Sequence, residues 1–341
     1  MNLTKIFFTL YQRLIFLFEP EKAHYISLTI AETLYKSWLK RFLKSKTKKF
    51  PTDSMGIKFE NPIGLAAGFD KNGDYLNFIS NIGFGFVEIG TVTPKPQIGN
   101  PKPRIFRIKE EQAIINHLGF NNKGVDYLKS NLKNFRQVVP IGVNIGKNSS
   151  TPIENAYQDY EYCMRQIYSL CDYISLNISS PNTKDLRDLH LEKYMNGFLK
   201  NIKKLHEKLI KVYKMRIPLI LKISPDLTED QIISICRYVK KYEIEGIIAT
   251  NTTVNKSLLQ NNKYHYFQGG LSGKPLNEKS NTVIELLKTN LNNDVAIIGV
   301  GGVHSYQSAK QKMDNGAKLL QMYTGLVYSG TNLIKEIVEN L

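Results

Sequence analysis

A lysine inside an otherwise apolar run is the first residue of this 341-residue sequence that points to chemistry. Lys222 is the fourth residue of the segment Leu219–Ile223, which reads LILKI. Burying a cation is costly unless an anion meets it, so this position predicts either an anionic ligand or a structural carboxylate partner. No acid stands beside Lys222 in the sequence, which favours the ligand.

Amide, hydroxyl and glycine residues follow other short apolar runs. Asn144, Asn177 and the stretch 250–252 (TNT) supply hydrogen-bonding side chains, and Gly301-Gly302 leaves backbone N–H groups uncovered. Glycine turns that follow strands can approach a phosphate closely. Together with Lys222, these residues predict a phosphate-bearing cofactor that lies across several strand ends. The glycines form no GxGxxG pattern, so a dinucleotide site of the Rossmann type has no support.

Eight apolar, β-rich runs, separated by longer helix-compatible segments, must position these residues. Alternation of this kind is typical of repeated βα units with a parallel sheet. The count predicts an α/β fold of the (β/α)8 TIM-barrel class, in which chemistry lies at the C-terminal ends of the strands. The longer gaps after Val92 and Thr250 predict active-site loops. The expected strands are 63–67, 86–92, 141–145, 173–178, 219–223, 246–250, 295–300 and 319–323.

Basic residues concentrate at the N-terminus. The chain has 46 Lys and Arg against 30 Asp and Glu, a net charge of +16, and residues 1–50 hold ten bases and three acids, or +7. Such an excess suits nucleic acid, an anionic membrane surface or anionic small ligands. We therefore expect an amphipathic helical region over residues 1–50 and the barrel domain over residues 51–341.

Within this region, two helices with apolar faces are expected over residues 3–18 and 23–43. Lys5 and Arg13 interrupt the first helix, so no uncharged run approaches the ~20 residues that span a bilayer. With the acid-free basic stretch 36–49, the helices can lie in a membrane interface, although they can also pack on the main domain. The bulk of the apolar faces and the one-sided charge favour the membrane. These faces contain Leu3, Ile6, Phe7, Leu10, Leu14, Leu17 and Phe18, then Ile26, Ile30, Leu34, Trp38 and Phe42.

Composition excludes several other classes of protein. With 42% apolar and 22% charged residues, the chain resembles an ordinary globular protein rather than a disordered, collagen-like or coiled-coil one. The three cysteines form no CxxC pair, so we expect a reducing compartment, no disulfide framework and no metal site.

Five segments carry more specific motifs: 61–71 (NPIGLAAGFDK), 116–122 (NHLGFNN), 177–183 (NISSPNT), 249–253 (ATNTT) and 298–302 (IGVGG). In residues and order they closely resemble the dihydroorotate dehydrogenase family, and the resemblance runs from about Glu19 to the C-terminus. Ser180 is similar to class 2, the quinone-linked, membrane-associated branch, because class 1 carries cysteine at that position. The resemblance implies oxidation of (S)-dihydroorotate to orotate in pyrimidine biosynthesis, with FMN passing the electrons to a membrane quinone, ubiquinone or menaquinone.

The resemblance also implies which residues serve each ligand. Ser180 would be the catalytic base, which removes the C5 proton of dihydroorotate opposite the flavin. FMN would be held by Ala67, Gly68, Lys71, Thr91, Asn144, Asn177, Lys222, Thr250, Gly273, Gly302, Tyr323 and Thr324. Dihydroorotate would be held by Lys71, Asn116, His117, Leu118, Gly119, Phe120, Asn177, Asn182, Asn251 and Thr252. The quinone head would meet His24, Arg107 and Tyr323.

These roles suit the chemistry of the ligands. Asparagine matches the alternating N–H and C=O groups of orotate, Lys71 supplies charge for its carboxylate, and Lys222 would stabilise reduced flavin. A serine hydroxyl is weakly basic, so we expect a proton relay through Thr183 and a water near Phe120. The family commonly has Arg-Met where this chain has His117 and Leu118, so His117 could equally be a solvated loop histidine.

Two other functions compete with this one. A flavin barrel that acts on tRNA, such as a dihydrouridine synthase, would use the positive charge for phosphates, but the serine base and the lack of an expected RNA-binding domain argue against it. A membrane-binding scaffold without activity would leave Lys222 and the amides unexplained. We therefore expect no nucleic-acid partner and a peripheral position on the cytoplasmic face of the bacterial cell membrane.

Overall fold

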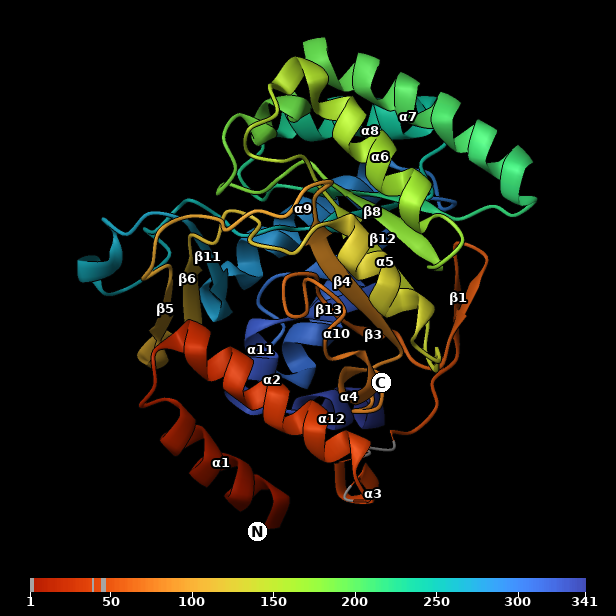
Figure 1. Cartoon of the computed structure of the whole chain (residues 1–341). Coiled ribbons are helices and arrows are strands. Elements are labelled where there is room, and N and C mark those ends of the chain that lie inside the picture. The colour runs from red at the N-terminus through yellow and green to blue at the C-terminus, as the bar shows by residue number, and fades with distance from the viewer. Residues whose placement is uncertain (1–2, 39, 44–46) are drawn as a thin grey trace.

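Eight parallel strands close into a barrel in the computed structural model, which describes residues 3–38, 40–43 and 47–341 (Figure 1). Their order around the barrel is β10-β12-β13-β3-β4-β7-β8-β9, so successive barrel strands of the chain are neighbours. The predicted TIM-barrel class is therefore confirmed. The barrel strands are β3 (Ile63–Leu65), β4 (Phe86–Val92), β7 (Ile141–Ile145), β8 (Tyr173–Asn177), β9 (Leu219–Ile223), β10 (Gly246–Ala249), β12 (Ala296–Val300) and β13 (Leu319–Met322).

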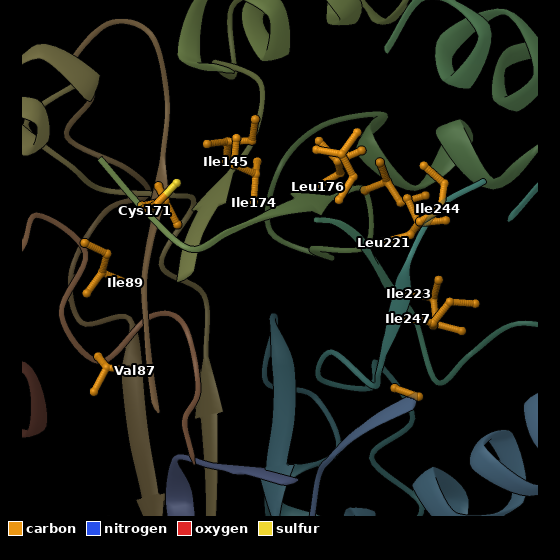
Figure 2. Packing of buried hydrophobic residues seen from close by; sticks show 14 of the residues in the cluster. Val87, Ile89, Ile145, Cys171, Ile174, Leu176, Leu221, Ile223, Ile244 and Ile247 are labelled. Carbon is orange, nitrogen blue, oxygen red and sulfur yellow. The ribbon is translucent and has the colours of Figure 1, made fainter. Parts of the chain in front are cut away.

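Side chains of the barrel strands alternate between the barrel interior and the surrounding helices. In β9, Leu221 packs outward, whereas its neighbours Ile220 and Lys222 are directed inward. Figure 2 shows part of the outward layer, in which Val87 and Ile174 pack with residues of neighbouring strands. Both faces are buried, which explains why the strands read as nearly continuous apolar runs.

Helices cover the outside of the barrel between successive strands (Figure 1). Several begin with clear sequence signals, such as the capping box that Thr228 forms with Gln231 at the start of α8. The helices of the barrel domain are α4 (Leu76–Ile79), α5 (Val125–Lys133), α6 (Ala156–Ile167), α7 (Glu192–Tyr213), α8 (Glu229–Lys241), α9 (Asn277–Asn290), α10 (Tyr306–Asp314), α11 (Thr324–Ser329) and α12 (Asn332–Asn340).

The two long gaps of the sequence join into a second sheet beside the barrel mouth. Strands β5 (Ile105–Ile108), β6 (Ala113–Asn116) and β11 (Gly270–Gly273) are antiparallel and pair in the order β11-β6-β5. A small core that includes Leu259 and Leu271 supports this sheet. The gaps were predicted as loops, and the sequence did not indicate that they pair with each other.

A hairpin closes the opposite, N-terminal end of the barrel. Strands β1 (Thr52–Ser54) and β2 (Ile57–Phe59) pair antiparallel. The ring of Phe59 lies edge-on to that of Phe86, with centroids 5.2 Å apart. Apolar residues therefore fill this end of the barrel and leave the C-terminal end for chemistry.

The N-terminal helices have different ends from those predicted. The helices are α1 (Leu3–Ile15), α2 (Pro20–Lys36) and the short α3 (Lys40–Leu43), rather than 3–18 and 23–43. Glu19 sets the start of α2, because its carboxylate accepts hydrogen bonds from the N–H groups of Glu21 and Lys22. Within the predicted basic stretch, residues 44–46 lie outside the described residues.

One face of these helices packs on the barrel domain. In α2, the buried Glu21 accepts hydrogen bonds of 2.6 and 3.0 Å from Arg104. Burial alone would raise the pKa of Glu21, but hydrogen bonding and charge from Arg104 bring it below its ordinary value. In α1, Gln12 donates to the carbonyl oxygens of Val327 and Tyr328. The alternative that the helices pack on the main domain therefore holds for this face.

Large apolar side chains remain in solvent in α1 and in the residues that follow α1 and α2. Leu14 is 64% exposed, Leu17 81% and Trp38 70%. Among the described residues, no helix is both long enough and apolar enough to cross a membrane. The side chains of residues 3–7, 42 and 43, which include four predicted apolar positions, lie outside the described residues.

The packing of an aromatic ring on a glycine gives a stability prediction. A Cβ at Gly142 would lie 2.0 Å from Cζ of Tyr173, so Gly142→Ala should overpack the barrel interior and lower the free energy of unfolding by about 1–3 kcal/mol. Gly197 in α7 is the control, because a Cβ there meets nothing within 4 Å and helical alanine should add roughly 0.5–1 kcal/mol. Thermal unfolding of both variants should therefore shift in opposite directions, and an unchanged Gly142→Ala would contradict this packing.

Candidate active site

The C-terminal ends of the barrel strands open into one continuous cavity of about 560 Å³. It extends to α1 and α2, where Phe8, Ile15 and Ala31 line it. All residues predicted to serve the cofactor, substrate, base or quinone line this cavity, except Asn144 and His117. Those that line it are His24, Ala67, Gly68, Lys71, Thr91, Arg107, Asn116, Leu118, Gly119, Phe120, Asn177, Ser180, Asn182, Lys222, Thr250, Asn251, Thr252, Gly273, Gly302, Tyr323 and Thr324.

Below the strand ends, a layer of inward polar side chains forms around Glu88. Its carboxylate accepts hydrogen bonds from Asn144 (2.9 Å), Tyr173 (3.1 Å) and Gln321 (2.8 Å), and it lies 3.8 Å from Nζ of Lys222. The expectation that Lys222 lacks a carboxylate partner is therefore wrong. The closed barrel brings inward residues of distant strands into one layer, which adjacency in the sequence does not indicate.

Lys222 nevertheless keeps its hydrogen-bonding capacity for a ligand. Burial lowers the pKa of its ammonium group, while the nearby carboxylate of Glu88 opposes that shift. Within the described part of the chain, Nζ of Lys222 forms no hydrogen bond, and the side chain lines the cavity. Its N–H groups are thus available to an acceptor that enters from the strand ends.

The amide of Asn177 is the centre of a network at the ends of β4, β7 and β8. Its Nδ2 donates to Oγ1 of Thr91 (2.9 Å) and Oδ1 of Asn144 (3.1 Å). On the other side, Nδ2 of Asn251 donates to Oδ1 of Asn177 (3.3 Å) and Oγ of Ser179 (3.0 Å). Asn144 is fully buried and lies behind the cavity, so it orients the amides that line it.

A second chain of amides crosses from the loop after β8, which carries Ser180, to the added sheet. Nδ2 of Asn182 donates to Oδ1 (2.9 Å) and to the backbone oxygen (3.0 Å) of Asn116 in β6. Nδ1 of His117 lies 3.2 Å from Oδ1 of Asn182, which can only accept, so the imidazole donates. His117 lines a shallow surface depression with Phe106 and Phe267 instead of the cavity. It orients Asn182 from outside, a contact that neither sequence-based alternative described.

Ser180 lies buried against the cavity, in the loop after β8. Its Oγ accepts a hydrogen bond from the N–H of Asn182 (3.2 Å). No histidine or carboxylate of the described residues hydrogen-bonds to this oxygen. Oγ1 of Thr183 is buried without a hydrogen-bond partner, and such an atom usually requires a water or a ligand. The hydroxyl of Thr183 is therefore available to form a hydrogen bond with a water or a ligand.

Glycine and hydroxyl groups line the end of the cavity near β12 and β13. Gly302 has a φ of 77°, and a Cβ there would lie 2.4 Å from Cα of Asn277, so only glycine fits. Thr324 begins α11, and its Oγ1 lies 2.8 Å from Oγ of Ser272. Backbone N–H and hydroxyl groups in this arrangement are the donors that a phosphate requires.

A separate group of polar residues lies where the cavity meets α2. Burial lowers the pKa of Lys71 to about 8, with Glu21 opposing the shift. Burial, aided by Lys71, lowers the pKa of His24 to about 4, so its imidazole is neutral, and Nε2 donates to the carbonyl oxygen of Phe69 at 2.8 Å. The rings of Phe69 and Tyr323 lie 5.3 Å apart. Lys71 and His24 are therefore the polar groups of this region, with the aromatic rings of Phe69 and Tyr323 beside them.

Arg107 joins this region to α1. It donates to the backbone oxygens of Phe16 (3.4 Å) and Phe18, and its guanidinium carbon lies 4.3 Å from the centroid of the Phe16 ring. Burial lowers the pKa of Arg107, with Tyr328 opposing that shift. The side chain of Arg107 therefore both holds α1 and lines the cavity.

A family model described as dihydroorotate dehydrogenase matches residues 50–341. The chain belongs to this family. Relatives named dihydroorotate dehydrogenase (quinone) include one from Buchnera aphidicola, 47% identical over 98% of this chain and 100% of that protein. One from Neisseria meningitidis is 46% identical over 98% and 99%. A solved dihydroorotate dehydrogenase from Eimeria tenella, in complex with ferulenol, has 35% identity and a TM-score of 0.84, covering 94% of this chain and 90% of that one.

These similarities confirm the family, the quinone-dependent class 2 branch and the role in pyrimidine biosynthesis that the motifs predicted. Dihydroorotate and a quinone are accordingly the reaction partners, and the family is one of flavoenzymes. The sequence interpretation missed Glu88 and Gln321. Glu88 interrupts the apolar run 86–92 as Lys222 interrupts 219–223, so the same pattern could have indicated it.

The Lys222–Glu88 pair yields a prediction that separates its structural role from its role toward the flavin. Lys222→Met leaves a buried carboxylate without its cation and should cost about 3–5 kcal/mol of stability. Adding Glu88→Gln should restore much of that stability, because the uncompensated charge is gone. Thermal unfolding measures the change in stability. Flavin absorbance and anaerobic flavin reduction measure the role of Lys222 toward the flavin.

The double variant decides between the two roles. Slow flavin reduction in a re-stabilised Lys222→Met/Glu88→Gln protein is the expected result, since the cation remains absent. Native flavin content and reduction in that protein would show that Lys222 serves only to neutralise Glu88.

Proposed function

We propose that FMN and dihydroorotate meet at the barrel mouth and that the quinone reaches the same cavity between α1 and α2. The observation that carries this proposal is the continuity of one cavity, lined at one end by Ser180 and Asn177 and at the other by Ile15 and Ala31. A polar end suits a charged substrate, and an apolar end suits a lipid-soluble one. Two substrates can thus use one cofactor from different sides.

The residues at the strand ends suit FMN. Gly302 and Thr324 provide the donors for its phosphate, while Thr91, Asn177 and Lys222 provide hydrogen-bond groups for its ring. When bound, FMN accepts the hydride from C6 of dihydroorotate. Lys222 keeps a cation at the base of the cavity, where its charge favours an anionic reduced cofactor. The remaining predicted contacts, Ala67, Gly68, Lys71, Asn144, Thr250, Gly273 and Tyr323, surround this position.

Dihydroorotate fits the amide-lined part of the cavity. Lys71 binds its carboxylate, and Asn116, Asn182 and Asn251 match its N–H and C=O edges, with their orientations already set by hydrogen bonds. Leu118, Gly119, Phe120, Asn177 and Thr252 complete this site. His117 acts on it through Asn182.

Ser180 acts as the base that takes the proton from C5. Its hydroxyl is buried beside Asn182, and the unpaired Oγ1 of Thr183 can pass the proton through a water near Phe120 toward solvent. Removing the C5 proton and the C6 hydride together gives the C5=C6 double bond of orotate.

The quinone, ubiquinone or menaquinone, enters between the two N-terminal helices. Its apolar tail lies along the cavity face of α1 and α2, and its head lies near His24, Arg107 and Tyr323, all of which line the cavity. Neutral His24 donates a hydrogen bond from Nε2 to the carbonyl oxygen of Phe69, which fixes the orientation of its ring. The substrate and the quinone therefore need not compete for one entrance.

Residues 1–50 also attach the protein peripherally to the cytoplasmic face of the bacterial cell membrane, and residues 51–341 form the FMN domain. The exposed side chains of Leu14, Leu17 and Trp38 supply apolar area, and the basic residues of the region attract anionic lipid. The positive charge of this region then binds lipid phosphates rather than nucleic acid. Binding to anionic vesicles that persists unchanged in high salt would contradict the electrostatic part.

A bulky substitution in the helical passage tests the proposed function. Ala31 lines the cavity in α2, so Ala31→Phe should obstruct the quinone and slow its reduction about tenfold, or about 1.4 kcal/mol. Flavin reduction by dihydroorotate, followed anaerobically by absorbance, should stay near the native rate. Thr33→Phe is the matched control, because it places the same ring on the exposed side of the same helix.

Two results would count against the passage. Quinone reduction at the native rate in Ala31→Phe would place the entrance elsewhere. An equal loss in Thr33→Phe would show that the effect comes from a general disturbance of α2.

The pKa of Lys71 predicts how substrate binding depends on pH. Because burial lowers this pKa to about 8, the ammonium is present below that pH and is lost above it. The Kd of the product orotate should therefore rise, by about tenfold per pH unit well above the pKa. Flavin absorbance titrations measure this, and Lys71→Met should bind weakly with a flat profile. A native affinity that stays constant through this range would exclude Lys71 as the carboxylate ligand.

A further inference from the structure

Arg187 lies next to the loop that carries Ser180, and its role is not explained by the proposed ligand contacts. It belongs to the 3-10 helix η3 (Leu186–His190), which follows that loop. Its side chain is 24% exposed and does not line the cavity. Each of its three guanidinium nitrogens donates to a different acceptor.

These contacts join loops that follow three successive strands of the barrel. Nε donates to the backbone oxygen of Ser179 (3.1 Å), in the loop after β8 that carries Ser180. Nη2 donates to the backbone oxygen of Thr252 (3.1 Å), in the loop after β10 that carries Asn251. Nη1 donates to Oδ2 of Asp226 (3.0 Å), in the loop after β9.

Asp226 is itself anchored on its other side. Its carboxylate accepts hydrogen bonds from Nζ of Lys279 (2.6 Å), the hydroxyl of Thr253 and the N–H of Val254 (2.9 Å). Burial alone would raise the pKa of Asp226, but these donors bring it below its ordinary value, so the carboxylate stays ionised at neutral pH. Arg187 is thus held between a fixed anion and two backbone oxygens.

We propose that Arg187 is a positioning residue that holds Ser180 at a fixed place relative to the Asn251–Thr252 loop. This inference rests on the proposed function, in which Ser180 is the base. Proton transfer depends steeply on geometry, and a displacement near 1 Å can cost about a hundredfold in rate. A planar guanidinium reaches three acceptors in fixed directions, whereas the single nitrogen of lysine cannot replace it.

The conservative variant Arg187→Lys tests this role, because it keeps the charge and loses the three-way contact. Flavin reduction by dihydroorotate, measured anaerobically in a single turnover, should slow roughly tenfold to a hundredfold. Flavin content should change little, since Arg187 does not line the cavity. The Kd of orotate should rise by a smaller factor than the rate falls, because Arg187 touches the substrate site only at the backbone oxygen of Thr252. Asp226→Asn, which removes the anchoring charge, should slow the same step by a smaller factor.

Arg216→Lys is the matched control. Arg216 also pairs with a carboxylate, that of Glu245 at 2.6 Å, but beside the starts of β9 and β10 at the opposite end of the barrel. This variant should reduce its flavin at the native rate. If Arg187 were merely structural, Arg187→Lys would also reduce its flavin at the native rate, and only its unfolding temperature would be lower.

A double variant separates this inference from the proposed function. If Arg187 acts through Ser180, adding Arg187→Lys to Ser180→Ala should slow flavin reduction no further. Additive slowing, or a native rate in Arg187→Lys while Ser180→Ala is slow, would overturn the positioning role alone. A native rate in Ser180→Ala would refute Ser180 as the base and the inference with it.

Discussion

Lys222 and Glu88 lie 3.8 Å apart inside a closed barrel, and the rest of the site is arranged around the compensation of these buried charges. A carboxylate there must be hydrogen-bonded, so Asn144, Tyr173 and Gln321 donate to it from other strands. The same interactions fix Asn144, which then orients Asn177 at the strand ends. The orientation of the amides thus depends on Glu88, which lies behind the cavity wall, and on its pairing with Lys222, which lines the cavity.

The N-terminal helices have two different sides, one held on the barrel domain and one with exposed apolar residues. Glu21 and Glu32 anchor α2 through buried hydrogen bonds to Arg104 and to residues of α4, and Gln12 anchors α1. The anchored sides leave a space between helices and barrel, and the outer sides keep large apolar residues in solvent. Amphipathic patterning alone describes the outer side, whereas the hydrogen bonds determine which surface faces inward.

Loops after the strands are connected to one another instead of standing separately. Asn182 bonds to Asn116 in the added sheet, and the guanidinium of Arg187 joins the loops after β8, β9 and β10. Polar groups on separate loops would otherwise lose their relative positions through local motion, which a reaction between fixed groups does not tolerate. The added sheet and the arginine thereby restrain the positions of these loops relative to one another.

Much of this protein could be predicted from its sequence, because barrel strands that are buried on both faces leave apolar runs, and many predicted site residues lie at or just after the ends of those runs. The eight strands and the family followed from such local patterns and motifs, and all but two of the predicted site residues line the cavity. Three contacts could not be predicted in this way: the pairing of Lys222 with Glu88, the pairing of the two insertions in one sheet, and the pairing of Arg104 with Glu21. Those contacts join residues far apart in the chain, and which of them meet depends on how the barrel closes. An apolar run in the sequence indicates that a charged residue within it is buried. Only the tertiary structure decides which other buried charge becomes the partner of that residue.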